Sequence, residues 1–106
     1  MKVKIACVGK LKDKFIREAV AEYAKRLSRF CAFEIAEVSD ERAPESLSAA
    51  EEAQVLEREG ERLLGRIASS EYVVCLAIEG RRMRSEAFAE ILQSVFDRGI
   101  SCVTFV

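Results

Sequence analysis

Seven consecutive apolar residues, Tyr72 to Ile78, constrain the fold of this chain more than any other feature. The run is too short for a comfortable helix, is rich in β-branched and aromatic residues, and is closed by Glu79 and Gly80, so it predicts a strand buried on both faces. Such a strand belongs to a parallel sheet with helices on both sides. Ligands of open α/β sheets bind outside the carboxyl ends of the strands, so residues 76–84 are expected at the functional edge.

The rest of the chain alternates between strand and helix patterns. Strands are expected at residues 2–8, 33–38, 72–78 and 100–106, and amphipathic helices at about 14–27, 48–67 and 85–96. This alternation predicts an α/β fold with a mostly parallel sheet and helices on both faces. Glu34 and Glu37 indicate that the second strand lies at an edge with one face open to water. A chain of 106 residues is expected to form one domain over residues 1–106.

Several local signals fix where the helices begin and end. Asp13 and Ser85 are candidate N-caps of the first and third helices, Ser48 with Glu51 matches a capping box, and Gly99 can supply a left-handed helix end. The second helix is longer than the strands, so its first turns should overhang the sheet. Gly60 lies on its apolar stripe, which indicates a close approach of this helix to the sheet.

The residue types present exclude several kinds of chemistry. The chain has no histidine, which removes Ser-His and Cys-His nucleophilic catalysis and the commonest zinc ligand. Its four cysteines are scattered without a Cys-x-x-Cys pair, and three of them fall in predicted buried strands, where cysteine is a small hydrophobe. No metal site is therefore expected. The N-terminus has no signal peptide and no apolar run approaches a membrane span, so a cytoplasmic protein is expected.

Basic residues are concentrated at the start of the chain. Residues 1–30 carry nine Lys and Arg against three acidic residues, whereas residues 31–65 carry three against ten. Lys10 and Lys12 lie in the loop after the first strand, and Arg17 follows on the first helix. A cluster of this kind can bind phosphates, although charged runs are more often solvated helix faces.

The loops lack the common nucleotide-binding motifs. The segment from Gly9 to Lys12 is neither a Walker A loop nor a Gly-x-Gly-x-x-Gly turn. A receiver domain would need paired acids after the first strand and an aspartate after the third, and neither is present. Glu79 could serve as a general base, but a single carboxylate without a partner is more often a turn residue.

Separated motifs, taken together, resemble the bacterial RlmH (YbeA) family of SPOUT-class methyltransferases. They agree in spacing along the whole chain and comprise Val8-Gly9-Lys10-Leu11-Lys12, Glu22-Tyr23-Ala24-Lys25-Arg26-Leu27, Asp40-Glu41-Arg42-Ala43-Pro44-Glu45, Glu57-Arg58-Glu59-Gly60-Glu61-Arg62-Leu63-Leu64 and Leu76-Ala77-Ile78-Glu79-Gly80 with Ser85-Glu86. The family uses S-adenosyl-L-methionine to methylate N3 of a pseudouridine in 23S ribosomal RNA. The resemblance therefore implies an RNA methyltransferase that needs no metal.

The resemblance also implies a topology, a donor site and partners. The sheet order would be second, first, fourth, third and fifth strand, in an α/β-knot (SPOUT) fold that forms a homodimer and acts on ribosomal RNA or the ribosome. Leu76 matches the donor-contacting leucine of the family, and Ile78 lies within the segment Ala77 to Gly80 that would line the adenosine. Lys10, Lys12 and Arg17 become candidates for RNA phosphates. The catalytic residues of the family have no counterpart among these residues.

The sequence stops at Val106, directly after an apolar strand. The resemblance implies that these residues are the N-terminal part of an α/β-knot fold without the knot itself. We expect residues 1–106 alone to be inactive, and to expose the strand at residues 72–78 as an apolar sheet edge. The alternative is a non-enzymatic α/β module that binds RNA or a protein partner through its basic face. Donor binding separates the two hypotheses.

Overall fold

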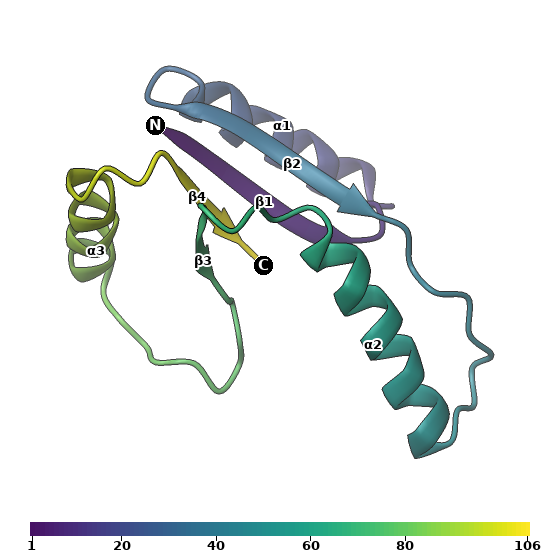
Figure 1. Cartoon of the computed structure of the whole chain (residues 1–106). Coiled ribbons are helices and arrows are strands. Elements are labelled where there is room, and N and C mark those ends of the chain that lie inside the picture. Colours follow the sequence, from purple (N-terminus) through teal and green to yellow (C-terminus); the bar gives the residue numbers. More distant parts are fainter.

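A computed structural model describes residues 1–106 and shows an α/β fold (Figure 1). Strands and helices alternate along the chain, as β1 (Lys2–Val8), α1 (Lys14–Leu27), β2 (Ala32–Val38), α2 (Ala49–Leu64), β3 (Tyr72–Val74), α3 (Ser85–Asp97) and β4 (Cys102–Phe105). The four strands form one parallel sheet in the order β2-β1-β4-β3. The predicted α/β class is confirmed, and so is the position of the last strand between the first and the third.

Strand β1 lies inside the sheet and sets its register. It pairs along its whole length with β2, from Lys2 opposite Ala32 to Val8 opposite Val38. On its other side it pairs with β4, where Lys4 is opposite Thr104 and Ile5 is opposite Phe105. Strand β2 pairs only with β1 and therefore forms an edge, as Glu34 and Glu37 predicted.

The alternation of side chains along the strands assigns the helices to two layers. In a parallel sheet, paired residues point to the same face, and neighbours along a strand point to opposite faces. Ile5 and Phe105 share the face of α1 and α3, since Ile5 lines a pocket with α1 and the Phe105 ring lies 5.8 Å from that of Phe88 in α3. Lys4 and Thr104 share the opposite face, where Lys4 contacts the Arg66 carbonyl just after α2. Helices therefore lie on both faces of the sheet, as predicted.

Helix α2 begins as its sequence predicts and then runs beyond the sheet. The Ser48 side chain accepts from the Glu51 N–H, and the Glu51 carboxylate accepts from the Ser48 N–H, which completes the predicted capping box. Figure 1 shows that the N-terminal turns project away from the strands, so the expected overhang is present. The predicted close approach at Gly60 is wrong, because a Cβ at this position would meet no atom within 4 Å.

Strand β3 is shorter and less covered than predicted. It spans only Tyr72–Val74, lies at the sheet edge next to β4, and leaves the Val73 side chain 45% exposed. Pairing with β4 stops where the Leu76 N–H donates to the Val106 carbonyl, at 2.8 Å. The residues that follow have no ladder partner, and Ile78 is fully exposed. The prediction of a strand over residues 72–78 buried on both faces is therefore wrong.

Helix α3 has one fully buried residue, Val95, and its Phe88 ring lies against Phe105 of β4. Its N-cap is Arg84 and its first residue is Ser85, so the predicted cap at Ser85 is off by one position. The left-handed glycine after the helix is confirmed, with Gly99 at φ 85°. Asp13 precedes α1 as predicted, but its side chain makes no capping hydrogen bond.

The buried core is small. Its apolar members are Ala6, Ala36, Val38, Val95 and Val103, and α1 contributes no fully buried residue. All four cysteines are free, and Cys75 is exposed in the loop after β3, which corrects its prediction as a buried strand residue. No group of metal-ligating side chains gathers in the chain, and none of its helices is long and apolar enough to cross a membrane.

Candidate functional site

The loop after β1 places two lysines at the carboxyl edge of the sheet. Gly9 takes a left-handed φ of 81°, and its N–H donates to the Val38 carbonyl at the end of β2, at 2.8 Å. The chain turns here away from the sheet, and Lys10 and Lys12 follow in the loop that leads to α1. A residue with a side chain would be strained at this φ, so glycine fixes where the loop begins.

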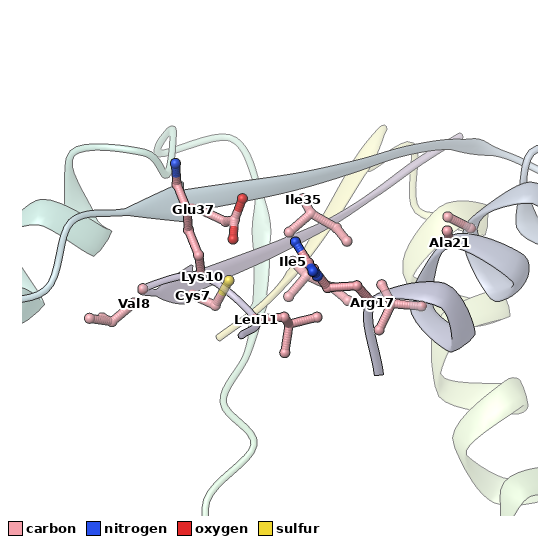
Figure 2. Close-up of a pocket in the computed structure, with 12 residues that line it drawn as sticks. Ile5, Cys7, Val8, Lys10, Leu11, Arg17, Ala21, Ile35 and Glu37 are labelled. Atoms are coloured by element: carbon pink, nitrogen blue, oxygen red, sulfur yellow. The ribbon is translucent and has the colours of Figure 1, made fainter. Parts of the chain in front are cut away.

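A pocket of about 580 Å³ lies between α1 and strands β1 and β2. It is lined mainly by aliphatic side chains, with three charged residues among them, Lys10, Arg17 and Glu37. Figure 2 shows Arg17 and Glu37 near Ile5 and Ile35, which belong to adjacent strands, and Lys10 beyond Glu37 with its amino group directed away from Arg17. The pocket is therefore an apolar slot that carries charges of both signs.

A second hollow, of about 510 Å³, lies at the same sheet edge. Lys10 lines both hollows, and Lys12 lines the second together with Glu37 and Asp40. Lys10 and Arg17 thus line one hollow, and Lys10 and Lys12 line the other. These three residues are the ones predicted from the sequence to bind RNA phosphates.

The three cations are exposed and make no ion pair, which leaves them available to an anionic ligand. Arg26, further along α1, differs from them because its Nε lies 3.3 Å from the Glu22 carboxylate. An unpaired cation can bind a phosphate without first giving up a carboxylate partner.

The Cys7 thiol lines the pocket beneath these charges, in surroundings that disfavour its thiolate. Burial raises the pKa of Cys7 above its ordinary value, and the Glu37 carboxylate raises it further. The reactive form of cysteine is the thiolate, which this environment disfavours. The pocket is consequently suited to binding rather than to covalent catalysis.

Leu76 and Ile78 lie in the loop after β3. This loop is also at the carboxyl ends of the strands, but two strand positions away from the loop after β1. Leu76 is 72% exposed, while its N–H is held by the Val106 carbonyl. The loop then makes a turn in which the Gly80 N–H donates to the Ala77 carbonyl at 2.9 Å. A Cβ on Gly80 would lie 2.9 Å from that carbonyl oxygen, so the turn requires glycine.

The loop after β3 exposes two apolar side chains. Leu76 and Ile78 pack against nothing that would bury them, although apolar side chains are stabilised by burial. Lys10, Lys12 and Arg17 do not share this loop, because β3 lies two strands away from β1.

The segment before β3 is anchored by a buried polar cluster that local sequence patterns did not reveal. Lys4 Nζ lies 2.7 Å from Glu71 Oε1, and the Thr104 hydroxyl donates to Glu71 Oε2 at 2.6 Å. These contacts hold the pKa of the Glu71 carboxyl below its ordinary value, the Lys4 hydrogen bond being the larger cause and the Thr104 hydroxyl the next. The cluster ties β1 and β4 to the start of β3, which carries the Leu76 loop.

A second cluster joins two of the motifs that carried the family resemblance. The Glu41 carboxylate is bonded by Arg58, at 2.8 Å, and by Arg62, both of α2. These two arginines hold the pKa of Glu41 below its ordinary value. The Arg62 guanidinium also donates to the Ser39 carbonyl, at 3.0 Å. Together these bonds fasten the loop after β2 to α2 and thereby fix one side of the second hollow.

Comparison with known proteins identifies the family. The family described as "Predicted SPOUT methyltransferase" matches residues 1–106. Similar proteins named "Ribosomal RNA large subunit methyltransferase H" occur in Latilactobacillus sakei, at 53% identity, in Ligilactobacillus salivarius, at 54%, and in Streptococcus uberis, at 46%. Each match covers 100% of this chain and 67% of the relative. The chain belongs to the SPOUT methyltransferase family.

Proposed function

We propose that this protein transfers a methyl group from S-adenosyl-L-methionine to N3 of a pseudouridine in large-subunit ribosomal RNA. The observation that carries the proposal is the position of two different surfaces at one sheet edge, an exposed apolar loop after β3 and unpaired cations after β1. The names of relatives about half identical to the chain support an RNA substrate.

The loop after β3 is the proposed donor site. Leu76 and Ile78 would pack against the adenine ring, and the backbone of the turn from Ala77 to Gly80 would line the adenosine. S-adenosyl-L-methionine supplies an electrophilic methyl carbon. The loop residues bind and orient this group, and the Leu76 to Val106 backbone bond keeps the loop at a fixed position on the sheet.

The basic residues after β1 are the proposed RNA site. Lys10, Lys12 and Arg17 would contact phosphates, because each is exposed and unpaired. Phosphate contacts position a nucleic acid without reading its sequence. Their proposed role is therefore to position the RNA at the carboxyl edge of the sheet, so that N3 of the target base is in line with the methyl group of the donor.

The chemistry requires no metal and no covalent nucleophile from the chain. Methylation forms a bond between N3 and the methyl carbon, breaks the S–CH3 bond of the donor to leave S-adenosyl-L-homocysteine, and releases the N3 proton to a base or to solvent.

We further propose that the protein works in the cytoplasm as a homodimer with the ribosome as its partner. The dimer and the ribosome are what the resemblance to the RlmH family implies, and the names of the relatives support a ribosomal RNA ligand.

Donor binding tests the enzyme against the alternative of a non-enzymatic module that binds RNA or protein. Calorimetric titration of the protein with S-adenosyl-L-methionine should show saturable binding, and the Leu76→Arg variant should lose it. Leu56→Arg is a matched control, because Leu56 is 64% exposed on α2 and lies outside the loop. Binding of RNA without any binding of the donor would favour the module.

A further inference from the structure

The pocket between α1 and the sheet has features that phosphate binding alone does not use. Eight of its twelve lining residues are hydrophobic, and they come from two strands and one helix. Ile5 and Ile35 form the strand side, while small residues, Ala21 and Ala24, form much of the helix side. Small side chains at these positions leave a space that larger ones would fill.

The charges at this pocket are arranged for a ligand with two chemically different ends. Lys10 and Arg17 make no ion pair in the structure, and both line an otherwise apolar space. Glu37 lines the same space, is exposed and also makes no hydrogen bond or ion pair. A nucleotide matches this set, because its phosphate would meet the cations and its base would enter the apolar part.

We propose that this pocket holds the base of an unpaired nucleotide that flanks the methylation target. The inference rests on the proposed function, since it assumes an RNA ligand. Proteins that read single-stranded RNA bind splayed bases through their faces and polar edges. Here aliphatic side chains would cover the faces of the base, and Lys10 with Arg17 would hold its phosphate.

The position of the pocket assigns it to a flanking nucleotide rather than to the target. Strand β1 lies two strand positions from β3, which is about 10 Å. The pocket lies further still, between β1 and β2, on the side of α1. A base bound there is too distant to receive a methyl group from a donor on the Leu76 loop, whereas a neighbouring nucleotide of the same strand can reach both sites.

Glu37 gives the pocket a base preference. An ionised carboxylate only accepts hydrogen bonds, and the exocyclic amino group of cytosine is a donor that acidic side chains bind. Uracil presents carbonyl oxygens at the corresponding edge, and these would face the carboxylate unfavourably. The pocket should therefore favour cytosine over uracil.

Fluorescence anisotropy with labelled five-nucleotide RNAs, oligo-C and oligo-U, tests the inference. The wild-type protein should bind oligo-C more tightly. Ala21→Phe places a ring in the pocket and should weaken this binding about tenfold. Ala19→Phe is the matched control, because Ala19 is two positions away on the same helix, is exposed and does not line the pocket. The Ala19→Phe variant should bind oligo-C as tightly as the wild-type protein does.

Two further variants separate the base from the phosphate. Glu37→Gln keeps the size of the side chain but adds a donor, so the difference between oligo-C and oligo-U should disappear. Lys10→Ala with Arg17→Ala should weaken the binding of both RNAs and lower the slope of log K against log salt by about 0.7, the value for one lost phosphate contact. Circular dichroism confirms that each variant is folded.

The outcomes distinguish this inference from the proposed function. If Ala21→Phe binds like Ala19→Phe, and Glu37→Gln leaves the ratio of the two affinities unchanged, the pocket does not hold a base. RNA methylation would stand in that case, with Lys10 and Arg17 as phosphate contacts only. If the wild-type protein binds neither RNA, both the inference and the proposed RNA face are contradicted.

Discussion

Lys4 and Glu71 form an ion pair of 2.7 Å in which the side chains are only 8% and 12% exposed. The two residues come from β1 and from the segment just before β3, and Thr104 of β4 completes the cluster. The contact therefore spans three neighbouring strands of the sheet. It holds β3 in place, and β3 carries the proposed donor loop.

Removal of the Glu71 charge should strongly destabilise the fold. Glu71→Gln leaves the Lys4 ammonium buried without its counter-charge, and such a loss costs about 3 kcal/mol of unfolding free energy. Urea unfolding of the wild-type and variant proteins measures the difference.

The matched control is the other ion pair of β1. Lys2 and Glu34 also lie 2.7 Å apart, but their side chains are 45% and 41% exposed. Glu34→Gln should have a much smaller effect, since exposed pairs contribute little. Equal destabilisation by the two substitutions would show that the burial of Lys4 and Glu71 has no energetic consequence.

The same carboxylate should make stability depend on pH under acidic conditions. The pKa of Glu71 is depressed in the folded protein by Lys4 and Thr104, while an unfolded glutamate titrates at about 4.3. The unfolded state then binds the proton more readily than the folded state. The contribution of Glu71 to the free energy of unfolding is therefore fully present above the unfolded pKa, and it is lost as the pH falls through the depressed folded pKa.

The pH effect is measured as a difference between two proteins. Urea unfolding from neutral pH down to below the depressed pKa should show the wild-type protein losing its advantage over Glu71→Gln as the pH falls. The comparison isolates Glu71, because Glu34 and Glu41, whose pKa values are also depressed, are present in both proteins. A difference that stays constant over the whole range would contradict the assignment.

Substitution in the loop after β3 should affect donor binding without affecting folding. Leu76 is 72% exposed, so Leu76→Arg removes no core packing, but it places a charge where the adenine ring is proposed to lie. Calorimetry should show a large loss of affinity for S-adenosyl-L-methionine. Ile78→Arg should act in the same direction. A folded Leu76→Arg protein with wild-type affinity would remove Leu76 from the donor site.

Charge reversal at Lys10, Lys12 and Arg17 should weaken binding to ribosomal particles and flatten its salt dependence. All three cations are exposed, so their replacement by glutamate should leave the fold and donor affinity intact. Lys25→Glu is the control, since Lys25 is also exposed on α1 but lines neither hollow at the sheet edge. Identical salt slopes for the triple variant and the wild-type protein would reject the proposed RNA surface.

Local sequence signals predicted the fold well where a few adjacent residues determine the geometry. The capping box of Ser48 and Glu51 and the left-handed Gly99 are both present. The order of the strands came from the family resemblance, and it is confirmed for the four strands present. Gly60 was misread because a glycine on an apolar stripe indicates close approach only if the helix lies on the sheet there.

The errors and omissions concern contacts between distant residues. A continuous apolar run gives no sign of where its pairing stops, so the strand predicted over residues 72–78 is a strand only at Tyr72–Val74. The cluster of Lys4, Glu71 and Thr104 joins positions up to 100 residues apart in sequence, and no local pattern marks it. The pocket beneath Lys10 and Arg17 was missed for the same reason, because its walls come from α1 and two strands.

Methyl transfer tests the central claim most directly. The protein expressed from its natural reading frame is incubated with large ribosomal subunits that lack the modification and with S-adenosyl-L-methionine labelled in its methyl group. Nucleoside mass spectrometry of the recovered RNA should find the label on N3 of a pseudouridine, and Leu76→Arg should abolish it. Label on another nucleoside, or none at all in a protein that binds the donor, would contradict the account.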